Sequence, residues 1–301
     1  MTNADHSQFK TTLLQLAKIV EESLIAYIDQ WQIEDETLRE AMKYSIKAGG
    51  KRIRPVLMLA VAKMLDKPYS LVLPYACALE LIHTFSLIHD DLPCMDDDDL
   101  RRGVPTCHKV YGEGMAVLAG DAMLNMAFEI MFQDAQANIG SAKHLNAARI
   151  IAKAAGASGM ISGQVLDLQA EGKEIAYEEL EKIHSLKTGA LLSAPLMSAA
   201  ELCEMDAEEK VHLSIFAKNT GLIFQIVDDI LDVVGNEDKL GKKIGSDHAN
   251  SKNTFVKIMG IEKSNELVKS MTVESLEQLE SIGCNTWFLE ELTVFLAKRE
   301  H

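Results

Sequence analysis

The chain concentrates carboxylates in two places, each of which follows an apolar stretch. The first is LIHDDLPCMDDDDLRRG (87–103), which holds six aspartates within ten positions. The second is VDDILD (227–232), where the i, i+4 spacing of Asp228 and Asp232 places both on one face of a helix. Carboxylates on an apolar helix are costly unless a cation neutralises them. The two clusters therefore predict bound cations.

The kind of cation follows from the ligands that each cluster offers. A calcium loop of the EF-hand type starting at Asp96 is excluded, because Leu100 and Arg101 stand where an oxygen ligand and a glycine are required. Magnesium fits better, since it takes few carboxylates, keeps waters and shares its remaining positions with substrate phosphates. For residues 97–99 taken alone, a solvated acidic loop is an alternative that stays open.

Cationic side chains that suit phosphate lie near the first cluster. Arg101 and Arg102 follow it directly and offer fork-shaped donors. The stretch GGKRIRP (49–55) adds three cations, although it is not a Walker loop and such a group is most often a solvated turn. His83 lies seven residues before Asp90, on nearly the same helical face. A single histidine in that position is more often an ordinary core residue.

The elements that carry these residues are predicted to be helices of one all-α domain spanning 1–301. Apolar residues recur at three- and four-residue steps over 71–91, and the stretch 211–234 is apolar on most faces. Breaks are expected at 66–70, 101–106, 170–177 and 234–247. Few runs rich in Val, Ile or Thr occur, which argues against a β-rich fold.

Composition narrows the class of protein. The 301 residues are 48% hydrophobic and 25% charged, and the net charge of −15 argues against a nucleic-acid partner. The five cysteines show no paired metal-ligand spacing, which indicates reduced thiols and a cytoplasmic location. The N-terminus lacks the apolar core of a signal peptide, and the longest uncharged stretches are too short to span a membrane. A soluble protein is expected.

Taken together and in this order, the stretches GGKRIRP, LIHDDLPCMDDDDLRRG, LAGDAML, GQVLDL, KTGAL and FQIVDDILDVVG resemble the trans-prenyltransferases. The resemblance covers residues 49 to about 247. It implies the class I isoprenoid synthase fold, a bundle of about ten long helices around a deep central cavity. It also implies a homodimer and about three Mg²⁺ ions that hold an allylic diphosphate.

The resemblance gives the matching residues their roles. The implied metal ligands are Asp90, Asp96 and Asp228, with Asp91 and Asp232 as lesser contributors. The positions that match contacts to the allylic diphosphate are Arg101, Lys187, Gln225 and Lys242. Those that match the metal-free isopentenyl diphosphate site are Lys51, Arg54, His83 and Arg102. Lys187 and Thr188 also match positions beside the allylic carbocation.

One segment departs from the family pattern. Where relatives read approximately Gly-Lys-x-Thr-Tyr-Pro, this chain has SKNTFVK (251–257). Lys252 keeps the charge of the family lysine, whereas Phe255 replaces the tyrosine and Val256 the proline. The role of Lys252 at the leaving group is therefore the weaker expectation.

The resemblance also carries a prediction of product length. An aromatic five residues before the first aspartate, here Phe85, together with two extra residues in the cluster, is the pattern of farnesyl-producing members. The expected activity is head-to-tail condensation of isopentenyl diphosphate with dimethylallyl and then geranyl diphosphate, stopping at C15. A geranylgeranyl or longer-chain synthase, or a non-catalytic partner subunit of one, remains an alternative. Class I terpene cyclases are disfavoured by the second cluster, Asp-Asp-Ile-Leu-Asp.

Overall fold

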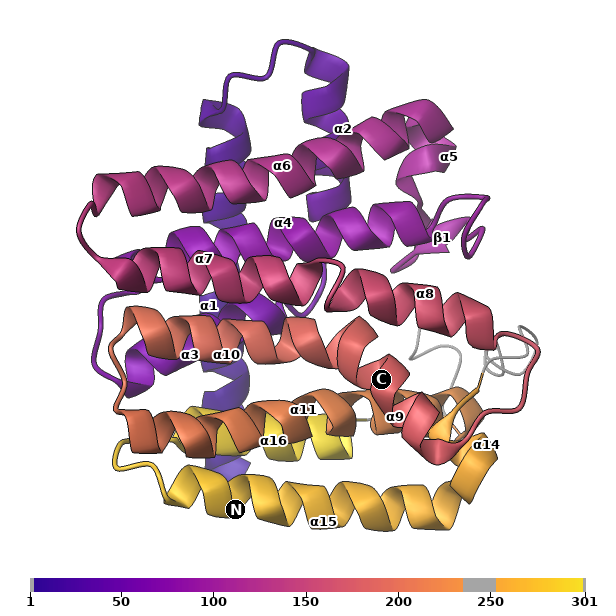
Figure 1. Ribbon diagram of the computed structural model, residues 1–301. Helices are drawn as coiled ribbons and strands as arrows, with labels where there is room; N and C mark the ends of the chain where they lie inside the picture. Colours follow the sequence, from indigo (N-terminus) through magenta and orange to yellow (C-terminus); the bar gives the residue numbers. More distant parts are fainter. Residues whose placement is uncertain (1–2, 235–252, 300–301) are drawn as a thin grey trace. The chain divides into compact units, whose positions relative to one another are not determined.

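A computed structural model describes residues 3–234 and 253–299, and most of these are helical (Figure 1). The fold is all-α, as the sequence predicts. The elements in the first half are α1 (Asn3–Gln30), α2 (Glu36–Lys47), α3 (Ile53–Met64), the 3₁₀ turn η1 (Tyr69–Leu71), α4 (Leu73–Asp90), β1 (Leu100–Arg101), β2 (Val104–Pro105), α5 (Cys107–Tyr111), α6 (Glu113–Ala137) and α7 (Ala142–Ala155). Those that follow are α8 (Met160–Ala170), α9 (Tyr177–His184), the π-helix η2 (Ser185–Gly189), α10 (Ala190–Leu202), α11 (Ala207–Val234), α14 (Phe255–Met259), α15 (Ile261–Glu280) and α16 (Trp287–Lys298).

The backbone groups into two compact units. The first runs to Leu59 and from Pro68 to Ala148, and the second comprises Ala60–Lys67 and the chain from Arg149 onward. The boundaries fall inside α3 and α7. The single domain over 1–301 stays a prediction.

The first unit is organised around α4, the helix predicted over 71–91. Leu79 and Ile82 are fully buried, and Pro74 stands in the first turn, where proline is tolerated because its missing N–H would have no helical partner. The long helix α6 runs beside α4 (Figure 1). This packing holds the end of α4 in place, and α4 ends at Asp90.

Helix α6 is long and apolar enough to cross a membrane by length and composition alone, which the sequence reading did not anticipate. Less than half of its most apolar window, 44%, is buried inside the chain. Within the first unit, this helix packs on α4, α2 and α5.

The second unit is organised around α11, whose predicted burial is confirmed. Ile223, Ile226 and Val227 are at most 4% exposed, and they join a core that includes Phe255 and Val268. Neighbours α10 and α15 flank α11 on either side (Figure 1). The aspartates of the second cluster therefore lie near the C-terminal end of a helix that packs into the core of this unit.

The acidic run after α4 forms a loop and a minimal hairpin, not a helix. Strands β1 and β2 pair antiparallel, with Leu100 opposite Pro105. The two turn residues, Arg102 and Gly103, have φ of 56° and 79°. Positive φ at both positions is the geometry of the tightest hairpins, because it matches the twist of the strands. The break predicted over 101–106 is correct, but the strands were not predicted.

Candidate active site

The first carboxylate cluster caps α4. Asp90 is the last residue of the helix, and the chain folds back so that the Asp96 N–H donates to the Asp90 carbonyl at 2.8 Å. The two predicted ligands of this cluster are thus carried on adjoining backbone. Both side chains are half-buried.

Asp91 is held by Arg101, a residue predicted to contact the allylic diphosphate. Its side chain is buried, and Arg101 Nε donates to Asp91 Oδ1 at 2.9 Å while the same guanidinium reaches Asp98 at 3.2 Å. Burial raises the pKa of Asp91, and the hydrogen bonds from Arg101 oppose that shift. Asp99 pairs with Lys109 at 2.6 Å, so this part of the acidic loop is also neutralised within the chain. Whether Asp91 binds metal stays a prediction.

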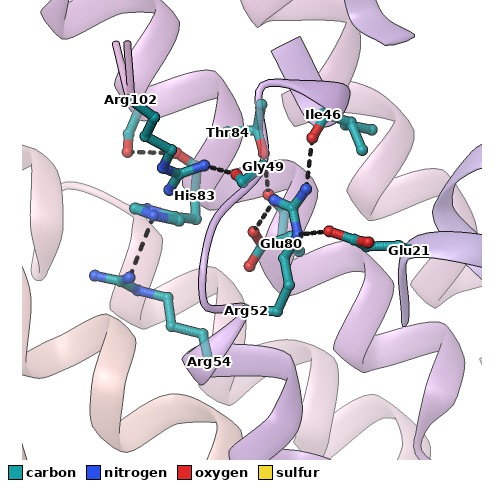
Figure 2. Close-up of polar contacts among 10 residues, drawn as sticks. Glu21, Ile46, Gly49, Arg52, Arg54, Glu80, His83, Thr84 and Arg102 are labelled. Atoms are coloured by element: carbon teal, nitrogen blue, oxygen red, sulfur yellow. Dashed lines mark hydrogen bonds and ion pairs between the residues drawn. The ribbon is translucent and has the colours of Figure 1, made fainter. Parts of the chain in front are cut away.

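Three of the four residues predicted to bind isopentenyl diphosphate lie together in the first unit (Figure 2). Arg54 Nη1 lies 3.3 Å from His83 Nε2, and Arg102 stands on the other side of the His83 ring, where it donates to the Gly49 carbonyl. Lys51 is exposed on the loop between α2 and α3, which also carries Gly49. Burial, followed by the charges of Arg54 and Arg102, lowers the pKa of His83 well below its ordinary value. His83 is therefore neutral near pH 7 and accepts or donates hydrogen bonds without adding charge.

In the second unit, a π-helical turn presents Lys187 and Thr188. The turn packs against two glycines: a Cβ on Gly163 would lie 2.1 Å from Lys187 N, and one on Gly221 would lie 2.8 Å from Gly189 Cα. Larger residues at either position would push the turn away. π-turns often mark functional sites, because they shift side chains out of helical register.

Both π-turn side chains have polar partners. Lys187 Nζ pairs with Asp167 Oδ2 at 2.5 Å, and Thr188 Oγ1 donates to Gln225 Oε1 at 3.1 Å. Gln225 Nε2 in turn donates to Asp229 Oδ1 at 3.2 Å. A continuous hydrogen-bonded chain therefore joins the π-turn to the second aspartate cluster.

The three aspartates of the second cluster differ in environment. Asp228, the predicted main ligand, keeps a side chain that is 41% exposed, whereas Asp229 and Asp232 are buried. Asp229 also accepts the Phe255 N–H at 2.8 Å, which ties the divergent segment to α11. Of the three, Asp228 is therefore the most accessible to a ligand.

Several contributing residues were missed from the sequence. Arg299 pairs with Asp228 at 2.6 Å and stacks over the Phe224 ring at 4.0 Å, but no motif marks the C-terminal segment. Burial lowers the pKa of Arg299, and Asp228 opposes that shift. Asp167 and Gly163 lie within the GQVLDL stretch, so that motif did carry a signal. An isolated glycine inside a helical pattern, as at Gly163, indicates close packing.

The carboxylates of the two clusters suit Mg²⁺ only if water and phosphate complete its coordination. Within residues 3–234 and 253–299, no three His, Cys, Asp or Glu side chains lie close enough to hold a metal ion by themselves. Mg²⁺ takes one or two carboxylates and fills its other positions with water and phosphate. Asp90 and Asp96 in the first cluster, and Asp228 in the second, offer carboxylates in that small number. Lys242 and Lys252, the other two predicted cations, lie outside the described residues.

Comparison with known proteins gives concordant matches. A family model described as polyprenyl synthetase matches residues 35–282. The farnesyl diphosphate synthase of Bacillus subtilis is 41% identical over 284 residues, which is 94% of this chain and 96% of that protein. Geranylgeranyl pyrophosphate synthase 4 of Arabidopsis thaliana is 41% identical over 297 residues, covering 97% of this chain and 78% of that protein. The crystal structure of a geranyltransferase from Legionella pneumophila superposes with a TM-score of 0.87 at 33% identity, covering 98% of each chain.

Proposed function

Because the chain belongs to the polyprenyl synthetase family, we propose that it condenses isopentenyl diphosphate with dimethylallyl and then geranyl diphosphate to give farnesyl diphosphate. At the level of the family, the chain is a prenyltransferase that makes a trans-prenyl diphosphate. The observation that supports the proposed chemistry is the hydrogen-bonded chain from Thr188 through Gln225 to Asp229, whereas the C15 product rests on Phe85. The hydrogen-bonded chain joins groups suited to a carbocation with a cluster suited to the leaving diphosphate.

The reaction begins when the allylic diphosphate ionises, which needs its growing negative charge to be neutralised. Asp90, Asp96 and Asp228 would hold about three Mg²⁺, which supply that neutralisation when bound, with Asp91 and Asp232 as lesser contributors. Further donors to the departing diphosphate are the cationic side chains Arg101, Lys187, Lys242 and Lys252. Asp167 orients Lys187 through their 2.5 Å contact.

The allylic carbocation is then stabilised by oxygen dipoles of the π-turn. Thr188 donates its hydroxyl hydrogen to Gln225, so the lone pairs of its oxygen remain available to face positive charge. Gln225 is fixed in that orientation because its amide nitrogen donates to Asp229. The Lys187 carbonyl is assigned the same role by its place in the turn.

The second substrate, isopentenyl diphosphate, is assigned to Lys51, Arg54, His83 and Arg102. A metal-free diphosphate site must rely on fork-shaped and point-charge donors, which this group supplies. Neutral His83 can donate one hydrogen bond while its other ring nitrogen faces Arg54. With the reactants prealigned and water excluded, the cation meets the double bond. The departing diphosphate takes the final proton.

Product length is assigned to Phe85 and the residues that brace it. Phe85 is 8% exposed, and its ring packs edge-to-face on His89 with centroids 5.4 Å apart. His89 Nε2 lies 3.1 Å from the Val117 carbonyl, and the ring rests on Gly120, where a Cβ would come within 2.3 Å. Phe85 lies about 7.5 Å along the helix axis from Asp90, which is on the order of one to two isoprene units, and the C15 assignment follows the aromatic residue at this position in farnesyl-producing members.

We assign the exposed face of α6 to a second copy of the chain. Leu118 and Phe132 on this helix are 57% and 58% exposed, and Val117 is 38% exposed. Such large apolar side chains on one long helix are typical of an interface. The proposed molecule is a cytoplasmic homodimer, and its mass by light scattering is the direct check.

The proposed product is tested by supplying purified chain with geranyl diphosphate, isopentenyl diphosphate and Mg²⁺ and identifying the products by mass. Farnesyl diphosphate as the terminal product supports the proposal. Accumulation of C20 or longer products would support the geranylgeranyl or longer-chain alternative. Turnover that requires a second, different chain would support the partner-subunit alternative.

A further inference from the structure

We propose that Arg52 is a positioning residue: its buried ion pair with Glu80 fixes the loop that presents Lys51 and Arg54, and thereby sets the affinity for isopentenyl diphosphate. The sequence offers Arg52 as one more cation in GGKRIRP. The structure gives it a different task. The inference rests on the proposed function, because it concerns the site assigned to that substrate.

All three nitrogens of the Arg52 guanidinium donate to acceptors within the protein (Figure 2). Nη1 donates to Glu80 Oε1 at 2.7 Å, Nε donates to Glu21 Oε1 at 3.0 Å, and Nη2 donates to the Ile46 carbonyl at 2.5 Å. These acceptors belong to α4, α1 and α2 respectively. Arg52 is 3% exposed and Glu80 is 2% exposed. A side chain so placed ties three helices to the loop and is turned away from solvent.

The loop needs such an anchor because of the backbone at Arg52. Its φ is 51°, whereas the other two positive φ values in the loop belong to Gly49 and Gly50, which adopt them without steric cost. A residue with a side chain is disfavoured in this left-handed region, so other contacts must offset that cost. For Arg52, the ion pairs of its own side chain are the compensating contacts.

The opposite side of the loop is held by Arg102. Its guanidinium donates to the Gly49 carbonyl and lies over Gly50, where a Cβ would be 2.6 Å from Nη1. The loop is therefore clamped between two arginines, one anchored in the core and one at the site. Glu80 also stands three residues before His83 on α4, so one helix both anchors the loop and presents the histidine.

Glu80 also reduces the electrostatic repulsion among the arginines around His83. Arg52, Arg54 and Arg102 all act on His83 as positive charges. Bringing such a cationic group together costs energy, which falls when a buried carboxylate pairs with one member. Glu80 neutralises the member that does not face the proposed substrate and leaves the others to bind diphosphate.

The test compares the Michaelis constants for the two substrates in matched variants. Glu80→Gln should raise the KM for isopentenyl diphosphate about tenfold or more, since a buried charged hydrogen bond is lost. The KM for the allylic substrate and kcat at saturation should change by no more than about twofold. Glu21→Gln should give a smaller rise of a few-fold, because Glu21 is 45% exposed.

The neighbouring residue supplies the control. Glu22 is 69% exposed and pairs only loosely with Lys18 at 3.7 Å, so Glu22→Gln should leave both KM values unchanged. Arg52→Lys keeps the charge but cannot reach three acceptors, and it covers the case in which Glu80→Gln does not fold. Calorimetric titration with isopentenyl diphosphate should show the same order of affinities without turnover.

An unchanged affinity for isopentenyl diphosphate in Arg52→Lys and Glu21→Gln would overturn the inference. So would a parallel loss of affinity for both substrates together with kcat, because that indicates general destabilisation. In either case, turnover by the unmodified chain would leave the proposed function standing. If the unmodified chain does not bind isopentenyl diphosphate by calorimetry, the proposed function and this inference both fail.

Discussion

Replacing Asp229 by asparagine should weaken both the fold and the reaction, and the structure sets the size of the effect. The buried carboxylate accepts two hydrogen bonds, from the Phe255 N–H at 2.8 Å and from Gln225 Nε2 at 3.2 Å. Asparagine has one acceptor oxygen, so one donor must face its NH₂ group. A hydrogen bond to a buried charged group contributes about 1.5–3 kcal/mol, and the unfolding free energy should fall by about 2–3 kcal/mol.

The effect on the reaction follows from Gln225. If its amide turns to suit the new side chain, Thr188 loses the acceptor that directs its hydroxyl hydrogen away from the carbocation. Each 1.4 kcal/mol of lost transition-state stabilisation lowers the rate about tenfold, so kcat should fall by at least that factor. Urea unfolding and single-turnover ionisation of the allylic substrate measure the two effects.

Asp206 offers a matched control for this substitution. It accepts a backbone N–H at 2.8 Å from Glu208, the same distance as in the Asp229 contact, but it is exposed. Asp206→Asn should therefore lose less than about 1 kcal/mol and keep its rate. If Asp229→Asn matched Asp206→Asn in both stability and rate, the reasoning about the hydrogen-bonded chain would be refuted.

Three further predictions use other parts of the molecule. Phe85→Ala should give C20 or longer products. Ser86 lies four residues before Asp90, nearly in line with it on α4, so Ser86→Phe should obstruct the growing chain and shift products towards C10. Both are measured by chromatography of the dephosphorylated prenols, and unchanged C15 product in both variants would show that Phe85 does not limit product length. Arg299→Met should lower the Mg²⁺ concentration for half-maximal rate several-fold, because it frees the Asp228 carboxylate from its ion pair; an unchanged or raised requirement would contradict this. Burial lowers the pKa of His184 from 6.5 to about 4, so the unfolded chain protonates first, and stability that is full above pH 6.5 should fall by about 3 kcal/mol towards pH 4. The unfolding free energy of His184→Gln should show a shallower acid slope; an equal slope would mean that carboxylates alone set it.

The main helices could be predicted because the buried face of a helix requires apolar residues at three- to four-residue steps, and the sequence shows this spacing. The stretches 71–91 and 211–234 correspond to α4 and α11, and the breaks at 66–70 and 170–177 fall between helices. Periodicity could not reveal the π-turn around Lys187, since one extra residue in a turn leaves no compositional mark. It also could not reveal β1 and β2, which are two residues each and depend on the left-handed turn at Arg102.

The residue types of the candidate site were proposed from motifs, and the contacts among them could be predicted only in part. Motifs point to Asp90, Asp228 and Lys187, because the proposed chemistry restricts which side chains can stand there. The interaction partners of these residues could not be predicted from the sequence, because an ion pair such as that of Arg299 with Asp228 joins residues 71 positions apart. Arg52 shows the same limit, because its sequence neighbours suggest a phosphate contact and only its burial assigns it to Glu80.

The central claim is that both aspartate clusters serve a metal-dependent prenyl transfer, and product formation against Mg²⁺ concentration tests it most directly. The measurement uses purified chain, isopentenyl diphosphate and dimethylallyl diphosphate, with and without excess chelator, beside Asp90→Asn and Asp228→Asn variants whose folding is verified by circular dichroism. We expect farnesyl diphosphate with Mg²⁺, no product with chelator, and turnover lower by orders of magnitude in each variant. Undiminished turnover in excess chelator, or in both folded variants, would contradict the claim.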